Sequence, residues 1–152
     1  MQKRGLCRSI GVSNFTIDNL KELEEKYDVL PAINQVEFHP YHYQKELLEY
    51  CNSKNIIIEA YSPLVHAKRM DEPRLMAISD ELGKTPAQVL IRWAIQRGMV
   101  VLPKSVNQDR IVENFAVFDF DISNSLMKRL DDLDERYVTC WDPHNPPPYA
   151  PV

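Results

Sequence analysis

The sequence predicts an α/β protein built on a parallel sheet, and three observations carry that prediction. Short apolar runs alternate with segments of helical spacing along the 152 residues. The expected strands start near residues 8, 32, 56 and 99, and the last interval holds two helices. Polar residues able to bind a ligand follow these strands, where sites form in barrels and open α/β sheets.

Composition describes an ordinary globular chain and excludes several function classes. A net charge of -4 argues against a general nucleic-acid binder, which would normally present a basic face. No apolar run approaches the roughly 18 residues of a membrane span. The N-terminal residues lack the apolar segment of a secretory signal. Only four glycines are present and no G-x-G-x-x-G occurs, which argues against a Rossmann site or a P-loop.

The three cysteines indicate a reducing compartment. Cys7, Cys51 and Cys140 are odd in number and far apart, which does not suit a disulfide framework. They also lack the spacing of metal ligands, so we expect no metal site. These features predict a cytoplasmic protein.

The first predicted strand, Arg8–Ser13, ends in two small polar residues. Ser13 and Asn14 can hydrogen-bond a ligand, although a turn or a helix cap would also explain them. Thr16 is placed to cap the helix that follows, where leucines recur on one face.

The second predicted strand, Ala32–Phe38, is unusually polar. Alternation places Gln35 and Glu37 on the same face. Gln35 is therefore either a ligand-binding residue or a buried amide with its hydrogen bonds satisfied. His39 ends the strand, and a structural role suits it better than catalysis. A helix is expected around Gln44–Asn52.

The third predicted strand, Asn55–Tyr61, contains the run Ile56–Ile58, which predicts burial on both faces. Tyr61 at its end is placed either to stack on a flat ring or to pack in the core with its hydroxyl paired. Two helices are expected next, over Arg74–Leu82 and from the cap Thr85 to Arg97.

The stretch from Val100 to Asn114 predicts a short buried strand, a polar turn and a helix start. Lys104 and Ser105 follow the strand, Asn107 is a helix cap, and Arg110 lies in the first turn. Unpaired backbone N–H groups, the positive end of the helix dipole and two cations together favour an anion site. The alternative is a solvated turn and a surface helix with incidental charges.

A last helix is expected after the cap Asp121–Ser123, ending near Arg136. The segment Tyr137–Val152 is rich in proline and lacks periodicity, which predicts an extended arm. Trp141 in this arm either forms one wall of a pocket or packs the arm onto the body.

Four ordered sequence blocks resemble the aldo-keto reductase family. They are Gly11–Phe15 (GVSNF), Asn34–Pro40 (NQVEFHP), Ala60–Leu64 (AYSPL), and Leu102–Ser105 (LPKS) followed by Arg110–Asn114 (RIVEN). The resemblance implies a partial (β/α)8 TIM barrel of about four βα units, plus a C-terminal helix and a proline-rich tail. Residues 1–136 would form the NADP-binding half of the barrel, and residues 137–152 the tail.

The resemblance also implies a cofactor, NADP(H), and assigns residues to its nicotinamide end. Ser13, Asn14 and Gln35 would hold the carboxamide, and Tyr61 would stack on the ring. Amides both donate to and accept from a carboxamide, and an aromatic face packs on a flat ring, so these residue types suit the roles.

Seven further residues would bind the rest of the cofactor. Ser62 and Leu64 would line the pyrophosphate path, Lys104, Ser105 and Arg110 would bind the 2′-phosphate, and Glu113 and Asn114 would contact the adenine. Two cations neutralise a phosphate dianion, which favours NADP(H) over NAD(H).

The chain departs from the family pattern in its length. A full barrel typically needs roughly 250 residues, whereas these units resemble only the second half. The family's catalytic Asp, Tyr, Lys and His lie in the first half, so no catalytic residue is assigned here. We expect an NADP(H)-dependent enzyme that reduces small-molecule aldehydes and ketones, with little or no catalysis by this truncated chain alone.

Two other interpretations remain open. A half-barrel can act as a non-catalytic NADP(H)-binding or regulatory isoform that self-associates or pairs through its open strand edges. It can also be an unstable fragment without a function of its own. The identity of the carbonyl substrate is not encoded in these residues.

Overall fold

The computed structural model describes residues 4–140 and 142–143 and contains a four-stranded parallel sheet. The strands lie side by side in chain order, so the prediction of repeated βα units is confirmed. In register, Ser13 pairs with Gln35, and Gln35 pairs with Glu59. The strands are β1 (Gly11–Ser13), β2 (Ile33–Glu37), β3 (Ile57–Tyr61) and β4 (Val100–Val101).

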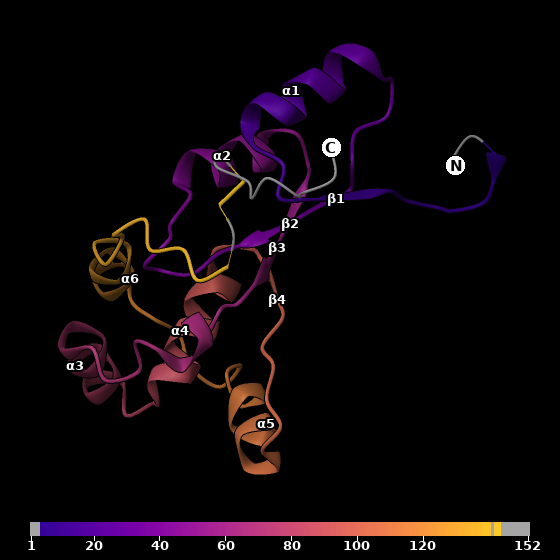
Figure 1. The fold of residues 1–152 in the computed structure, drawn as a ribbon. Helices are drawn as coiled ribbons and strands as arrows, with labels where there is room; N and C mark the ends of the chain where they lie inside the picture. The colour runs from indigo at the N-terminus through magenta and orange to yellow at the C-terminus, as the bar shows by residue number, and fades with distance from the viewer. Residues whose placement is uncertain (1–3, 141, 144–152) are drawn as a thin grey trace.

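The helices lie on one side of this sheet, as expected for part of a barrel wall (Figure 1). The described residues before β1 extend away from the body, and no helix in the described part of the chain lies on the opposite side of the sheet (Figure 1). The helices are α1 (Ile17–Lys26), α2 (Lys45–Ser53), the short 3-10 helix η2 (Val65–Ala67), α3 (Pro73–Leu82), α4 (Pro86–Gln96), α5 (Gln108–Phe115) and α6 (Asn124–Asp131).

Side-chain caps start the helices where the sequence predicts them. Thr16 and Thr85 form reciprocal capping boxes with the third residue of their helices, and Asn107 and Ser123 accept from backbone N–H groups. Gly83 ends α3 in the left-handed conformation with φ of 60°, which a residue with a side chain adopts only under strain.

The last helix ends at Asp131, short of the predicted Arg136, so that boundary was wrong. The chain beyond it is tied to the loop after β2. Backbone N–H groups of Glu135 and Tyr137 both donate to the carbonyl of Tyr41, at 3.2 and 2.8 Å. These tertiary bonds replace the helical ones, which the sequence pattern alone does not reveal.

The hydrophobic core lies between the helices and one face of the sheet. Val36 and Ile58 point into it from the strands, and Leu90 and Trp93 pack against them from α4. In the described part of the chain no helix is long and apolar enough to cross a membrane.

The other face of the sheet is open, which corrects two predictions of burial. Ile57, expected to be buried, is 47% exposed, and Val100 and Leu102 are 42% and 41% exposed. Alternation along a strand places these side chains on the face that none of the described helices covers, and β4 is an edge strand. Because these helices cover only one face of the sheet, apolar residues on the other face are in contact with solvent.

Candidate functional site

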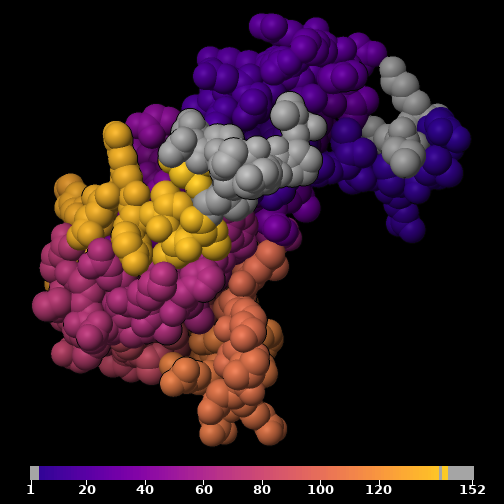
Figure 2. Space-filling view, in the orientation of Figure 1, coloured from indigo at the N-terminus to yellow at the C-terminus, as the bar shows by residue number. Residues whose placement is uncertain are grey.

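An open groove of about 910 Å³ lies between the segment that follows β3 and the segment from β4 into α5. In Figure 2 the orange segment projects from the body next to the magenta segment. The groove brings together all seven residues predicted for the phosphates and the adenosine, namely Ser62, Leu64, Lys104, Ser105, Arg110, Glu113 and Asn114. The other lining residues include His66, Met70 and Thr85, which the sequence did not assign to a ligand site.

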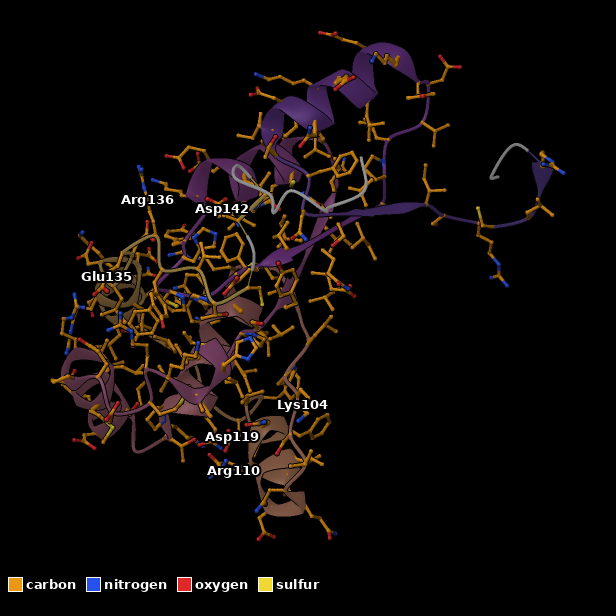
Figure 3. The ribbon with its side chains drawn as sticks, viewed as in Figure 1. Lys104, Arg110, Asp119, Glu135, Arg136 and Asp142 are labelled. Carbon is orange, nitrogen blue, oxygen red and sulfur yellow. The ribbon has the colours of Figure 1, made fainter. Side chains whose placement is uncertain are left out.

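Two cations face this groove, and neither has a partner of opposite charge in the described part of the chain. Lys104 follows β4 and Arg110 lies in the first turn of α5, and Figure 3 shows both beside that helix. Neither side chain forms an ion pair with any residue among 4–140 and 142–143. Because α5 directs its positive end here as well, the groove favours a strongly anionic ligand.

The loop that carries Lys104 is braced by its neighbours. The backbone N–H of Asn107 donates to the hydroxyl of Ser105 at 3.1 Å, and the same hydroxyl donates to the carbonyl of Asn107 at 3.2 Å. The side chain of Asn107 accepts from the backbone N–H of Arg110 at 3.1 Å. These bonds fix the turn and the helix start, so Lys104 and Arg110 project from an ordered frame.

Residues of α4 hold the far end of the groove. The hydroxyl of Thr85 donates to the carboxylate of Glu113 at 2.5 Å. The amide of Gln88 donates to the carbonyls of Glu113 and Ala116, at 3.3 and 3.0 Å. Asn114 is only 8% exposed, and its amide finds no hydrogen-bond partner within the described residues. Such an amide has free donors and acceptors for a ligand.

A second cluster unites the four residues predicted for the nicotinamide end. The hydroxyl of Tyr61 donates to Oδ1 of Asn14 at 3.0 Å, and the hydroxyl of Ser13 donates to the carbonyl of Gln35 at 3.0 Å. Asn14 has a φ of 58°, a conformation that asparagine tolerates better than most residues. Since Tyr61 and Ser62 are consecutive, this cluster adjoins the groove.

The side-chain amide of Gln35 has a hydrogen-bond partner on the neighbouring strand. Its amide nitrogen donates to the carboxylate of Glu59, its neighbour in register on β3. This bond uses one of the two N–H donors of the Gln35 amide, so the second N–H and the amide oxygen stay available to a ligand. A hydrogen bond within the sheet and a bond to a ligand are therefore compatible for Gln35.

Tyr61 stays neutral over a wide pH range. Burial, together with the charges of Cys140 and Glu37, raises the pKa of Tyr61 to about 12. A phenol with so high a pKa is a poor proton donor near neutral pH, whereas its face remains suited to stacking.

Glu37, at the end of β2, is a functional candidate that the sequence did not reveal. It is 3% exposed and accepts hydrogen bonds from His39 and from Thr139 and Cys140. Burial raises the pKa of Glu37, but the bonds from His39, Thr139 and Cys140 outweigh it and lower the pKa to about 2. Alternation placed Glu37 beside Gln35, but nothing in the pattern pointed to partners more than 100 residues away.

Cys140 also meets two residues that line the groove. Its Sγ lies 3.5 Å from both the hydroxyl of Ser62 and Nε2 of His66, which are themselves 3.1 Å apart. The segment around Cys140 therefore joins the nicotinamide cluster to the groove. Trp141, predicted either to line a pocket or to pack the tail, lies outside the described residues.

Comparison with known proteins agrees with this geometry. The sequence profile described as the Aldo/keto reductase family matches residues 1–135. The glyoxal reductase of Bacillus subtilis is 44% identical over 138 residues, which are 90% of this chain and 50% of that protein. Among solved structures, MGS-M4, an aldo-keto reductase from a deep-sea metagenome library, is 36% identical with a TM-score of 0.88, over 94% of this chain and 54% of its own.

One of the similar structures contains a nucleotide. The Bombyx mori aldo-keto reductase AKR2E4, in complex with NADP, is 33% identical with a TM-score of 0.83, over 91% of this chain and 48% of its own. The present chain spans about half the length of the curated relatives it matches. The expected partial barrel is thus confirmed by its structural neighbours.

Proposed function

This chain belongs to the aldo/keto reductase family, and from that premise we propose that it forms the NADP(H)-binding half of an oxidoreductase. The complete enzyme would reduce small-molecule aldehydes or ketones to alcohols by hydride transfer. The observation that carries the proposal is the groove in which Lys104 and Arg110 lie without anionic partners among the residues that the structure describes.

The residues of the groove fit the phosphate and adenosine parts of NADP(H). Lys104, Ser105 and Arg110 would bind the 2′-phosphate, since two cations and a helix N-terminus suit a dianion. Glu113 and Asn114, held from α4, would contact the adenine, and Ser62 and Leu64 would line the pyrophosphate path. The nicotinamide supplies the hydride when the cofactor is bound.

The second cluster fits the nicotinamide itself. Ser13, Asn14 and Gln35 would hold the carboxamide, and Tyr61 would stack on the ring with its hydroxyl held by Asn14. Because Tyr61 adjoins Ser62, one continuous path would lead from this cluster to the groove.

We propose that this chain alone has little or no catalytic activity. Carbonyl reduction needs a proton donor as well as a hydride, and the family's catalytic set has no counterpart in this sequence. Loss of general acid catalysis alone typically lowers a rate by roughly 10²–10⁴-fold. We further propose a cytoplasmic location, on the cysteine pattern given above.

A titration of the 152-residue chain with NADPH, followed by the nicotinamide fluorescence, tests the proposal. Saturable binding is expected, and Arg110→Ala should weaken it by about tenfold, the loss of one charge-assisted hydrogen bond. Lys21→Ala is the matched control because it removes one exposed cation far along the chain from the groove. If the wild-type chain does not bind NADPH, the proposal is wrong.

The open sheet face favours a second candidate function, that of an association module. Ile57, Val100 and Leu102 are exposed on this face. The rings of Phe115 and Phe118 form an edge-to-face pair with 5.6 Å between their centroids, and these side chains are 75% and 65% exposed. Apolar surface beside unpaired strand edges favours pairing with another chain, including a second copy. Light scattering over a range of concentrations would detect such pairing, and a strictly monomeric chain would exclude self-association.

A further inference from the structure

The carboxylate of Glu37 gathers an unusual number of donors for one side chain. The backbone N–H of Thr139 donates to Oε1 at 2.8 Å, and the backbone N–H of Cys140 donates to Oε2 at 3.0 Å. The hydroxyl of Thr139 and Nε2 of His39 also bond Oε1. Both carboxylate oxygens are thus occupied, and three of the four donors come from the C-terminal segment.

The bonds to Glu37 place Thr139 and Cys140 relative to the sheet. Glu37 is the last residue of β2 and pairs in register with Tyr61 at the end of β3. Thr139 and Cys140, which bond Glu37, therefore lie at the carboxyl ends of these two strands. Cys140 in that segment reaches Ser62, the residue after Tyr61, with 3.5 Å between Sγ and the hydroxyl.

We propose that Glu37 is a positioning residue that anchors Thr139 and Cys140 across the ends of β2 and β3. In that position Cys140, Ser62 and His66 form one wall between the nicotinamide cluster and the groove. The role of this wall depends on the proposed NADP(H) site. The anchor, which is the set of bonds between Glu37 and the residues Thr139 and Cys140, depends only on the observed hydrogen bonds. Glu37 itself would touch no cofactor atom and would act only through the segment that it holds.

A surface role for Glu37 does not account for these contacts. The side chain is 3% exposed, and a buried carboxylate is costly unless its hydrogen bonds are satisfied. Its partner His39 is 1% exposed and lies two residues after the end of β2, so the carboxylate is also bonded from its own part of the chain. The other three donors to Glu37 come from Thr139 and Cys140, in the segment after α6.

Amide hydrogen exchange at Thr139 and Cys140 tests the anchor without any nucleotide. Glu37→Gln replaces one acceptor oxygen by an NH2 group that faces N–H donors, so exchange should accelerate by roughly tenfold or more. Glu37→Asp keeps the charge and should restore much of the protection. Glu22→Gln, a carboxylate paired with Lys26 on the surface of α1, should leave exchange at Thr139 and Cys140 unchanged.

Thr139→Val provides a milder variant should Glu37→Gln fail to fold. It removes one donor to Glu37 and keeps the backbone bonds, so a smaller acceleration, about tenfold at most, is expected at Cys140. Exchange in α4 should stay as in the wild type, which separates local release from global unfolding. Unchanged exchange at Thr139 and Cys140 in Glu37→Gln, together with unchanged exchange at Cys140 in Thr139→Val, would overturn the anchor.

The wall is tested by titrating the same variants with NADPH. In Glu37→Gln, the release of Thr139 and Cys140 should lower the affinity for NADPH and shift the nicotinamide fluorescence. Glu37→Asp should recover both properties. If exchange at Thr139 and Cys140 is faster but the affinity for NADPH and the nicotinamide emission are unaltered, the proposed wall is wrong and the anchor is supported. If the wild type binds no NADPH, the proposed function fails and the wall fails with it, whereas the exchange experiment still decides the anchor.

Discussion

The hydroxyl of Tyr61 lies 3.0 Å from Oδ1 of Asn14, so one hydrogen bond links the carboxyl ends of β1 and β3. Strand β2 runs between them in the sheet. The bond fixes the position of the Tyr61 hydroxyl beside Asn14. It also occupies the phenol of Tyr61, which leaves the ring face as the surface available to a ligand.

Substitution of Tyr61 separates its ring from its hydroxyl. Tyr61→Ala should weaken NADPH binding by about tenfold or more, since stacking on an aromatic side chain is worth about 1–3 kcal/mol. Tyr61→Phe keeps the ring and should lose mainly about 1 kcal/mol of unfolding free energy, from the bond to Asn14. Fluorescence titration and urea denaturation measure the two effects. Tyr50→Ala, on α2, is the aromatic control, and equal affinity losses in Tyr61→Ala and Tyr61→Phe would contradict the stacking role.

Glu37 gives the protein a stabilising contribution that depends on pH. Its hydrogen bonds lower the pKa to about 2, below its ordinary value of 4.5. A carboxyl group with a lowered folded-state pKa stabilises the fold fully above pH 4.5 and loses this contribution as the pH falls toward 2. The unfolding free energy of the wild type should therefore drop over this interval by more than that of Glu37→Gln. Parallel curves for the two proteins would show that the bonds to Glu37 do not form.

Gln88 is expected to support both stability and the groove. It is 8% exposed, and its amide bonds the carbonyls of Glu113 and Ala116. Gln88→Ala leaves both carbonyls without this donor and should cost about 1–3 kcal/mol of unfolding free energy, measured by urea denaturation. Gln108→Ala, at the exposed start of α5, serves as the control. A loss no larger than that of Gln108→Ala would show that water replaces Gln88 readily.

Local sequence signals predicted most of the elements because each signal acts over a few residues. Thr16, Thr85 and Asn107 cap helices by bonding the backbone close to themselves, so their positions follow from the sequence. The polar residues after the strands assembled as expected because parallel strands end at one edge of the sheet. The division of the chain at residue 136 stays a prediction.

The errors and omissions share a cause in long-range contacts. Ile57 and Val100 lie in apolar runs that look buried, yet they face the side of the sheet where the described residues form no helix. The end of α6 and the role of Glu37 depend on contacts with the loop after β2 and with Thr139. Periodicity measures which face of an element is apolar, but it does not report which distant segment covers that face.

The most direct test of the account compares the affinities for NADPH and NADH in the wild type and in a double variant, Lys104→Ala with Arg110→Ala. These nucleotides differ only in the 2′-phosphate that the two cations are proposed to bind. The wild type should bind NADPH at least about tenfold more tightly than NADH, as expected for charge-assisted hydrogen bonds to a phosphate. The double variant should lose that preference and keep its affinity for NADH. Equal affinities in the wild type, or a preference that survives in the double variant, would contradict the assignment of this groove to NADP(H).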